Sequence, residues 1–307
     1  MSCTRRLGAV VLAATVAVLA ACGSSPAAGP SRSPGLLSVT TSFYPLEFAA
    51  ERIGGQWVQV NSLTAPGVEP HDLELTPKQI VGIRTAQVVI YLRGFQPAVD
   101  DAIDAMGDTG ALDVSGTADL LRVDQTGMPG SGHGALDPHF WLDPIRYAAV
   151  VTAIGAEFAV KDPAHAATYR SNATALVGDL TDLDTDYRQG LGHCVHRDLV
   201  TGHAAFGYLA LRYGFTQRAI TGLSPDAEPD AASMARLIGY IREHDVTTVY
   251  TETLTSPALA ETIARNAGAK VAVLDPIEGV TTTSLGADYL EIMRSNLATL
   301  TVGQQCS

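Results

Sequence analysis

The sequence has few basic residues and lacks the short motifs that mark common enzyme classes. It contains 20 Lys and Arg residues against 32 Asp and Glu residues, a formal net charge of −12. Because nucleic-acid binding usually needs a basic face, this balance argues against a nucleic-acid partner. The chain also lacks GxGxxG and Walker fingerprints, and the HExxH and GxSxG motifs of many hydrolases. These absences weaken the common nucleotide-binding and hydrolase interpretations, and we do not expect an enzyme.

Long apolar runs are absent except at the N-terminus, where Leu7–Leu19 is shorter than the ~20 residues that span a membrane comfortably. Arg5 and Arg6 precede this run, and small residues leading to Cys22 follow it. This pattern resembles a bacterial lipobox, which predicts a signal peptide over residues 1–21 and a lipid on the Cys22 thiol. We therefore expect an extracytoplasmic protein that is anchored to the cell membrane by lipid.

Cysteine is scarce, and its placement fits an exported chain. Cys3 leaves with the signal peptide and Cys22 takes the lipid, so Cys194 and Cys306 remain. An even pair in an oxidising compartment predicts a disulfide. Two free thiols, or a metal-binding role for Cys194, are the alternatives. After Cys22 the chain is rich in Ser, Pro, Gly and Ala, so we assign residues 22–36 to a flexible tether.

Strand patterns alternate with helix patterns in two stretches, which predicts an α/β protein with parallel sheets. The two stretches define an N-terminal lobe over 37–162 and a C-terminal lobe over 191–307. Residues 163–190 between them read as one long helix capped by Asp162. Its apolar residues recur at 3-4-3-4 spacing and so form a single stripe on one helical face, at Ala173, Leu176, Leu180, Leu183 and Tyr187. Such a helix is expected to pack against both lobes.

Four candidate metal ligands lie in loops that follow predicted strands or precede predicted helices: His71, His139, His203 and Asp275. In open α/β sheets, ligands bind beyond the carboxyl ends of the strands, so two residues from each lobe would face a shared cleft. Three imidazoles and one carboxylate suit Zn²⁺. Their wide separation along the chain argues against a finger-type structural site.

Several motifs resemble those of the metal-binding subunits of bacterial ABC importers for zinc and manganese. The similar segments are Thr41-Ser-Phe-Tyr-Pro45, Pro66-Gly-Val-Glu-Pro-His-Asp72, Asp137-Pro-His-Phe-Trp141, Gly202-His-Ala-Ala-Phe-Gly-Tyr208, Thr251-Glu252 and Leu274-Asp-Pro276. The resemblance covers the chain from about Val39 onward. It implies two lobes, each with a four-stranded, mostly parallel sheet flanked by helices, joined by one long rigid helix. The metal would lie between the lobes, bound by His71, His139, His203 and Asp275.

The resemblance also suggests the metal and the partners. Family members with histidine at the third ligand position look like zinc binders and those with glutamate like manganese binders, and here the residue is His203. We expect a monomer that binds Zn²⁺ and passes it to an ABC permease with its ATPase. Manganese binding on the same scaffold is the alternative, and a surface metallohydrolase or an adhesin is a more distant one.

Other polar residues near the predicted ligands invite a supporting role. Asp72, with Glu69, flanks His71, and Glu252 ends a strand that faces the cleft, so we expect Asp72 and Glu252 to orient ligand histidines. The chain departs from many zinc-binding relatives before the second ligand. Where they carry a long loop rich in His and Asp, this sequence has only a short Gly-rich segment with His133, which we expect to be a solvated loop residue.

Overall fold

The computed structural model describes residues 35–107, 110–127 and 135–307. The predicted signal peptide, Cys22, nearly all of the tether and His133 lie outside the described residues. No helix within these ranges is both long and apolar enough to cross a membrane. All described residues belong to one compact unit, so the domain boundaries expected from the sequence stay predictions.

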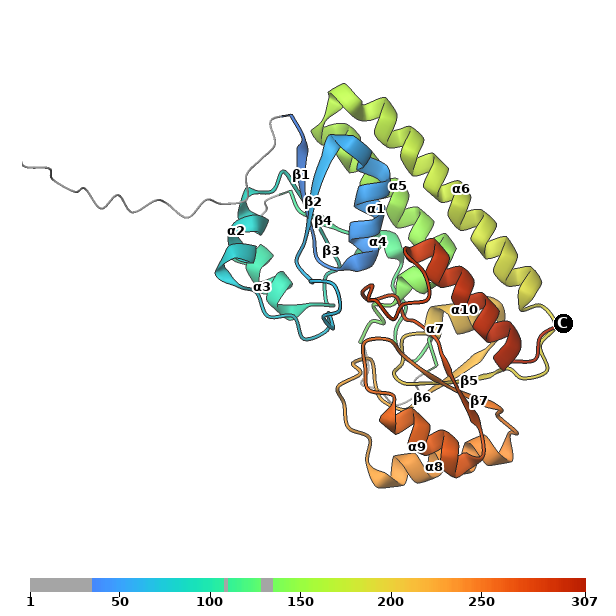
Figure 1. The fold of residues 1–307 in the computed structure, drawn as a ribbon. Helices are drawn as coiled ribbons and strands as arrows, with labels where there is room; N and C mark the ends of the chain where they lie inside the picture. The colour runs from blue at the N-terminus through green and yellow to red at the C-terminus, as the bar shows by residue number, and fades with distance from the viewer. Residues whose placement is uncertain (1–34, 108–109, 128–134) are drawn as a thin grey trace, which may run out of the picture. The chain divides into compact units, whose positions relative to one another are not determined.

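The N-terminal lobe is built on a parallel four-stranded sheet (Figure 1). Its strands, in spatial order, are β2 (Val58–Ser62), β1 (Leu37–Thr41), β3 (Val88–Tyr91) and β4 (Leu112–Asp113). Its helices are α1 (Tyr44–Gly54), α2 (Pro77–Thr85), α3 (Pro97–Asp104), the short α4 (Ser115–Ala118) and α5 (Pro144–Lys161), with 3-10 turns η1 (Gly55–Trp57) and η2 (Phe140–Leu142).

The C-terminal lobe repeats this plan. Its strands, in spatial order, are β6 (Thr216–Ala219), β5 (Asp198–Thr201), β7 (Thr248–Thr251) and β8 (Lys270–Val273), again all parallel. Its helices are α7 (Gly207–Tyr213), α8 (Ala231–Glu243), α9 (Ala258–Ala267) and α10 (Tyr289–Gly303). The predicted α/β class, with four strands in each lobe, is confirmed.

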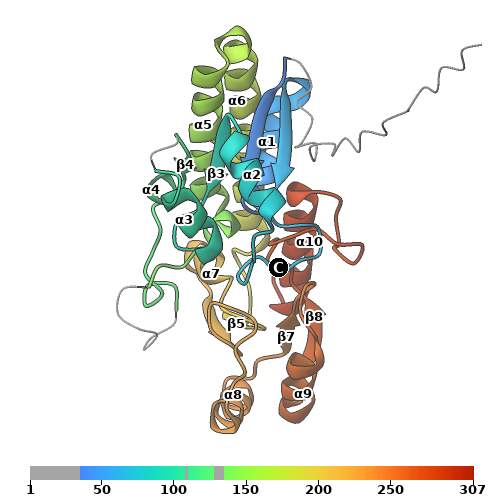
Figure 2. The same cartoon turned by 90° about the vertical axis from the view of Figure 1, so that its left-hand side faces the viewer.

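Each sheet is covered on both faces, and residue alternation along the central strands accounts for this. In β3, Val88 and Ile90 join the core shared with α1 and α5, whereas Val89 and Tyr91 face α2 and α3. Successive strand residues point to opposite faces, so a strand buried on both faces reads as a continuous apolar run. Figure 2 shows α8 and α9 together on the side of the second sheet away from α10.

The long helix α6 (Ala166–Gly190, 25 residues) packs against helices of both lobes (Figure 1). It contacts α1 and α5 of the N-terminal lobe and α10 of the C-terminal lobe. All five residues of the predicted apolar stripe are buried. One apolar cluster runs from Leu37 through this stripe to Leu300, so the lobes share a core.

The start of α6 differs from the prediction. Pro163–His165 form a 3-10 turn, η3, before the α-helix begins at Ala166. Asp162 makes no N-cap hydrogen bond there. Its carboxylate instead forms a hydrogen bond with the His165 ring and accepts one from the Tyr169 hydroxyl. Side chains three and seven residues downstream therefore bind the carboxylate that the sequence pattern assigned to capping.

The predicted disulfide between Cys194 and Cys306 is present. It joins the segment that follows α6 to the segment that follows α10, 112 residues later in the chain. Backbone bonds support it: Val195 and His196 donate to the carbonyls of Gln305 and Gln304. The bridge lies just before β5 begins, and thus at the opposite end of that strand from His203.

Candidate metal centre

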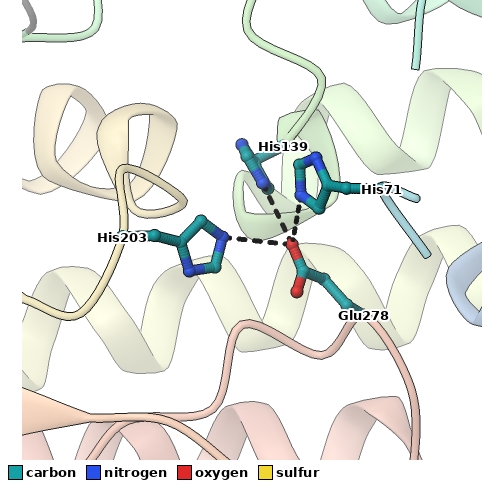
Figure 3. Close-up of side chains that lie close together, drawn as sticks. All are labelled: His71, His139, His203 and Glu278. Atoms are coloured by element: carbon teal, nitrogen blue, oxygen red, sulfur yellow. Dashed lines mark hydrogen bonds and ion pairs between the residues drawn. The ribbon is translucent and has the colours of Figure 1, made fainter. Parts of the chain in front are cut away.

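Three histidines and one glutamate meet at a single point between the lobes (Figure 3). The Nε2 atoms of His71, His139 and His203 lie 3.0, 3.1 and 3.2 Å from Oε1 of Glu278. The side chains of His139 and His203 are fully buried, and 9% of the His71 side chain is exposed. The four groups come from four separate loops, so the folded lobes and not local sequence bring them together.

His71 lies in the loop between β2 and α2. The Glu69 carboxylate accepts the His71 backbone N–H with both oxygens, at 3.0 and 3.1 Å. The buried Gln96 side chain donates to the Pro70 carbonyl and to the Thr64 hydroxyl, which fastens the loop to the lobe. The Phe95 ring packs against the imidazole in a T-shaped arrangement, with centroids 4.7 Å apart.

His139 is held by its neighbour two residues earlier. Asp137 Oδ1 accepts the His139 backbone N–H at 3.0 Å and lies 2.8 Å from the ring Nδ1. With Nδ1 bonded to a carboxylate, Nε2 is the nitrogen that faces Glu278. The chain then enters η2, and Asp143 caps α5 by accepting the N–H groups of Ile145 and Arg146.

His203 follows β5 and is held in the same way by a more distant residue. Glu252, at the end of β7, accepts the His203 backbone N–H at 2.7 Å and lies 2.6 Å from Nδ1. Gln217 and Thr201 donate to the His203 carbonyl. Glu252 therefore contacts His203 through both of its carboxylate oxygens.

Asp275 does not lie in this group, and Glu278 occupies the fourth position instead. The Asp275 side chain turns back on its own loop, where Oδ1 accepts the Ile277 backbone N–H at 2.8 Å. The turn at Ile277 carries the chain round, so the longer side chain three residues downstream reaches the histidines. The prediction of Asp275 as the fourth member of the group is therefore corrected. The carboxylate comes from the same loop, but Glu278 supplies it.

The charges of the site are strongly coupled. Burial alone would raise the pKa of Glu278, but the attraction of His203 and the bonds from all three histidines hold that pKa well below its usual value. Burial alone would lower the pKa of His203 and of His139. Hydrogen bonds and charge attraction from nearby carboxylates outweigh this effect. Asp137 and Glu278 raise the pKa of His139, and Glu278 and Glu252 raise the pKa of His203. For His71 burial dominates and lowers the pKa.

A second acidic group lies beside the site. Glu69, Asp72 and Asp226 have carboxylate oxygens within 4.8 Å of one another. Burial and the nearby Glu278 raise the pKa of Glu69 to about 7. We expected Asp72 to orient the His71 ring, but its carboxyl group faces Asp226. A hydrogen bond from Asp72 raises the pKa of Asp226. A cavity of about 390 Å³ adjoins this group and reaches Glu252, which is bonded to His203.

Two residues of the site escaped the sequence analysis, and each had a weak signal. Asp137 stands two residues before His139, a spacing at which one carboxylate can bind both the backbone N–H and Nδ1. Glu278 follows Asp275 in the same loop, but nothing in the sequence indicates a left-handed turn at Ile277, a residue type that rarely adopts one.

The donor set has a defined chemical preference. Two of three imidazoles present Nε2 inward because a carboxylate holds Nδ1, and the fourth group supplies oxygen. Nitrogen-rich, four-ligand sets of this kind suit Zn²⁺, whereas Mn²⁺ prefers oxygen ligands. The aromatic rings of Phe95 and Trp141 pack on the histidines and exclude water from this side.

Comparison with known proteins finds relatives along nearly the whole chain. The family model described as ZnuA, zinc-uptake complex component A, periplasmic, matches residues 39–303. The high-affinity zinc uptake system protein ZnuA of Bacillus subtilis is 37% identical over 305 residues, which cover 95% of this chain and 96% of that protein. The zinc-binding lipoprotein AdcA of Streptococcus pneumoniae is 35% identical over 277 residues, 87% of this chain but only 55% of AdcA, so this chain spans about half of it.

A solved structure shows the same fold. The Zn(II)-bound ZnuA-like domain of Streptococcus pneumoniae AdcA superposes with a TM-score of 0.74 and 35% sequence identity, covering 88% of this chain and 99% of that domain. The family match, the identity to whole-length relatives and the shared two-lobe fold lead to one conclusion. The chain belongs to the ZnuA family of periplasmic zinc-uptake components.

Proposed function

We propose that this protein binds one Zn²⁺ ion outside the cytoplasmic membrane and delivers it to an ABC permease. The convergence of three imidazole Nε2 atoms on one Glu278 oxygen, at 3.0 to 3.2 Å, carries the proposal. His71, His139, His203 and Glu278 are the ligands. No bond is made or broken, and the ion is cargo.

The surroundings support a cation site. Asp137 and Glu252 fix two of the rings from behind, and such outer partners both orient a ligand histidine and raise its basicity. Glu69 and Asp226 line the adjoining cavity, which gives an arriving cation an acidic approach. The relatives named as zinc-binding and zinc-uptake proteins agree with zinc as the cargo.

Calorimetric titration with Zn²⁺ and Mn²⁺ tests the metal assignment. We expect one Zn²⁺ per chain and much weaker Mn²⁺ binding, because three nitrogen donors disfavour the harder ion. His203→Ala should abolish tight binding, while His193→Ala, which removes an exposed imidazole, should not. Tighter binding of Mn²⁺ than of Zn²⁺ would overturn the assignment.

The location and partners form a further part of the proposal. The N-terminal pattern supports lipid attachment at Cys22 and an extracytoplasmic position at the membrane. We further propose that the protein acts as a monomer beside the permease and its ATPase. Cys22→Ala should release the protein from the membrane and stop incorporation of labelled palmitate. If the variant stayed membrane-bound and labelled, the anchor would be elsewhere.

A further inference from the structure

Glu278 reaches the histidines through an unusual turn after β8. Ile277, the residue before it, has a left-handed backbone with φ of 59° and is fully buried. A β-branched residue rarely adopts this conformation, since its side chain crowds the backbone. Such a conformation persists only when the surrounding structure holds it, and it commonly marks a functional position.

Three neighbours hold the segment that leads to the turn. The Asn296 side chain on α10 accepts the Asp275 backbone N–H at 2.9 Å and donates to its carbonyl at 2.7 Å. The indole N–H of Trp141 donates to the Pro276 carbonyl at 2.8 Å. These two contacts fix the chain before Ile277 but bind neither polar backbone group of Ile277 itself.

The remaining contact acts on Ile277 directly. Asp275 Oδ1 accepts the Ile277 backbone N–H at 2.8 Å, a bond from residue i to residue i+2 that closes the turn. The Asp275 side chain is buried and stands apart from the four groups that meet at the site. Its carboxylate thus bonds the backbone N–H of the strained residue next to Glu278.

We propose that Asp275 is a positioning residue for the metal site, whose carboxylate locks the left-handed turn at Ile277 and so presents Glu278 to the three histidines. This inference rests on the proposed zinc-binding function. It assigns to Asp275 a role distinct from ligation, and the two roles differ in what an isosteric change would do. Asparagine keeps an acceptor oxygen for the Ile277 N–H but is a poor substitute for a carboxylate that binds metal.

The test compares Asp275→Asn, Asp275→Ala and Glu278→Gln by competition with a zinc-binding dye and by the visible spectrum of bound Co²⁺. Loss of an outer partner typically weakens metal binding 10- to 100-fold, so we expect a loss of about that size for Asp275→Ala and for Asp275→Asn a change within about threefold. The Co²⁺ spectrum of Asp275→Ala should move toward that of Glu278→Gln, while that of Asp275→Asn should match the wild type.

Asp113 supplies a matched control. At the end of β4, its Oδ1 accepts the Ser115 backbone N–H at 2.9 Å, the same i to i+2 bond at a strand end in the other lobe, made by a residue outside the group of four. Asp113→Ala should lower the melting temperature without changing zinc affinity or the Co²⁺ spectrum. That difference separates a positioning role from a general loss of stability.

Each result bears on the inference. If Asp275→Asn lost affinity as severely as Glu278→Gln, or if folded Asp275→Ala bound zinc like the wild type, the positioning role would be refuted. If Asp275→Ala did not fold, the Asp275→Asn affinity would decide alone. Failure of the wild-type protein to bind zinc would instead refute the proposed function, so the two failures can be told apart.

Discussion

Two of the three histidines at the site have Nδ1 bonded to a carboxylate, and the third does not. Asp137 and Glu252 each bond both the backbone N–H and Nδ1 of a histidine, whereas Glu69 bonds only the backbone N–H of His71. The rings of His139 and His203 are therefore fixed before a metal arrives. At the scale of single residues, these pairs set the preorganisation of the site.

Replacing Glu252 by Gln should weaken zinc binding about 10- to 100-fold. Glu252 uses one carboxylate oxygen for the His203 backbone N–H and the other for Nδ1, so an amide would place an NH2 donor against one of these groups and the ring would lose its fixed orientation. Dye competition would measure the change. Glu261→Gln, an exposed substitution in the first turn of α9, is the control and should bind zinc as the wild type does. Equal affinity for Glu252→Gln and the wild type would show that the contact has no role in binding.

Zinc binding should release protons and strengthen as pH rises from 6 to 8. The pKa values of His139 and His203 are raised above the ordinary 6.5, so these rings hold protons in the metal-free protein that a metal must displace. Calorimetry in two buffers with different ionisation enthalpies would count the protons. Identical binding enthalpies in both buffers would contradict this expectation.

The same shifts predict how stability depends on pH. Raised histidine pKa values stabilise the metal-free fold below pH 6.5, and this contribution is lost as pH rises through the folded-state values. The lowered pKa of Glu278 stabilises the fold at pH values above 4.5, the usual pKa of a glutamate. This contribution is lost as the pH falls through the lowered pKa. Since zinc stabilises by binding the native state, the rise in melting temperature on adding zinc should be larger at pH 8 than at pH 6.

At the scale of elements, α6 connects the packing of the two lobes. The buried Leu180 lies in the apolar stripe that contacts both lobes, so Leu180→Ala should lower the free energy of unfolding by about 2 to 5 kcal/mol. Denaturant melts would measure the loss. Thr174→Ala, on the exposed side of the same helix, should change it by less than about 0.5 kcal/mol. If Leu180→Ala and Thr174→Ala lowered the free energy of unfolding by similar amounts, the apolar stripe would not be the part of α6 that stabilises the packing.

Helices and strands could be predicted from the sequence more completely than the metal site, because their patterns act within one segment of the chain. The stripe from Ala173 to Tyr187 was legible because helical periodicity acts within one segment. The start of α6 was not, because the Asp162 carboxylate is taken by His165 and Tyr169. The three histidines were chosen from loops that follow predicted strands or precede predicted helices, but the approach of Glu278 to them depends on a left-handed turn at Ile277, which this residue type does not predict.

At the scale of the whole molecule, the two lobes share one apolar core and are also tied by polar contacts. Tyr208 on α7 donates to the Asp137 carbonyl, and Arg212 on α7 pairs with Asp143 at the start of α5. Tyr289 donates to the Trp141 carbonyl next to the site. These contacts resist a wide separation of the lobes, so we expect metal loading and release to involve loop movements more than lobe opening.

The disulfide belongs to this scale because it closes a long loop of the chain. Replacing Cys194 and Cys306 together by Ala should cost about 2 to 5 kcal/mol of unfolding free energy, since the bridge restricts the unfolded chain. Zinc affinity should be unchanged, because the bridge lies at the other end of β5 from His203. Chemical denaturation and dye competition on the same samples would separate the two properties. A large loss of affinity would mean that the bridge reaches the site.

The most direct test of the central claim is anomalous diffraction from zinc-loaded crystals on both sides of the zinc absorption edge. We expect one strong peak per chain, among the Nε2 atoms of His71, His139 and His203 and the carboxylate of Glu278. A peak on the Glu69, Asp72 and Asp226 group, a peak bound by Asp275 in place of Glu278, or no peak within the cleft would contradict it.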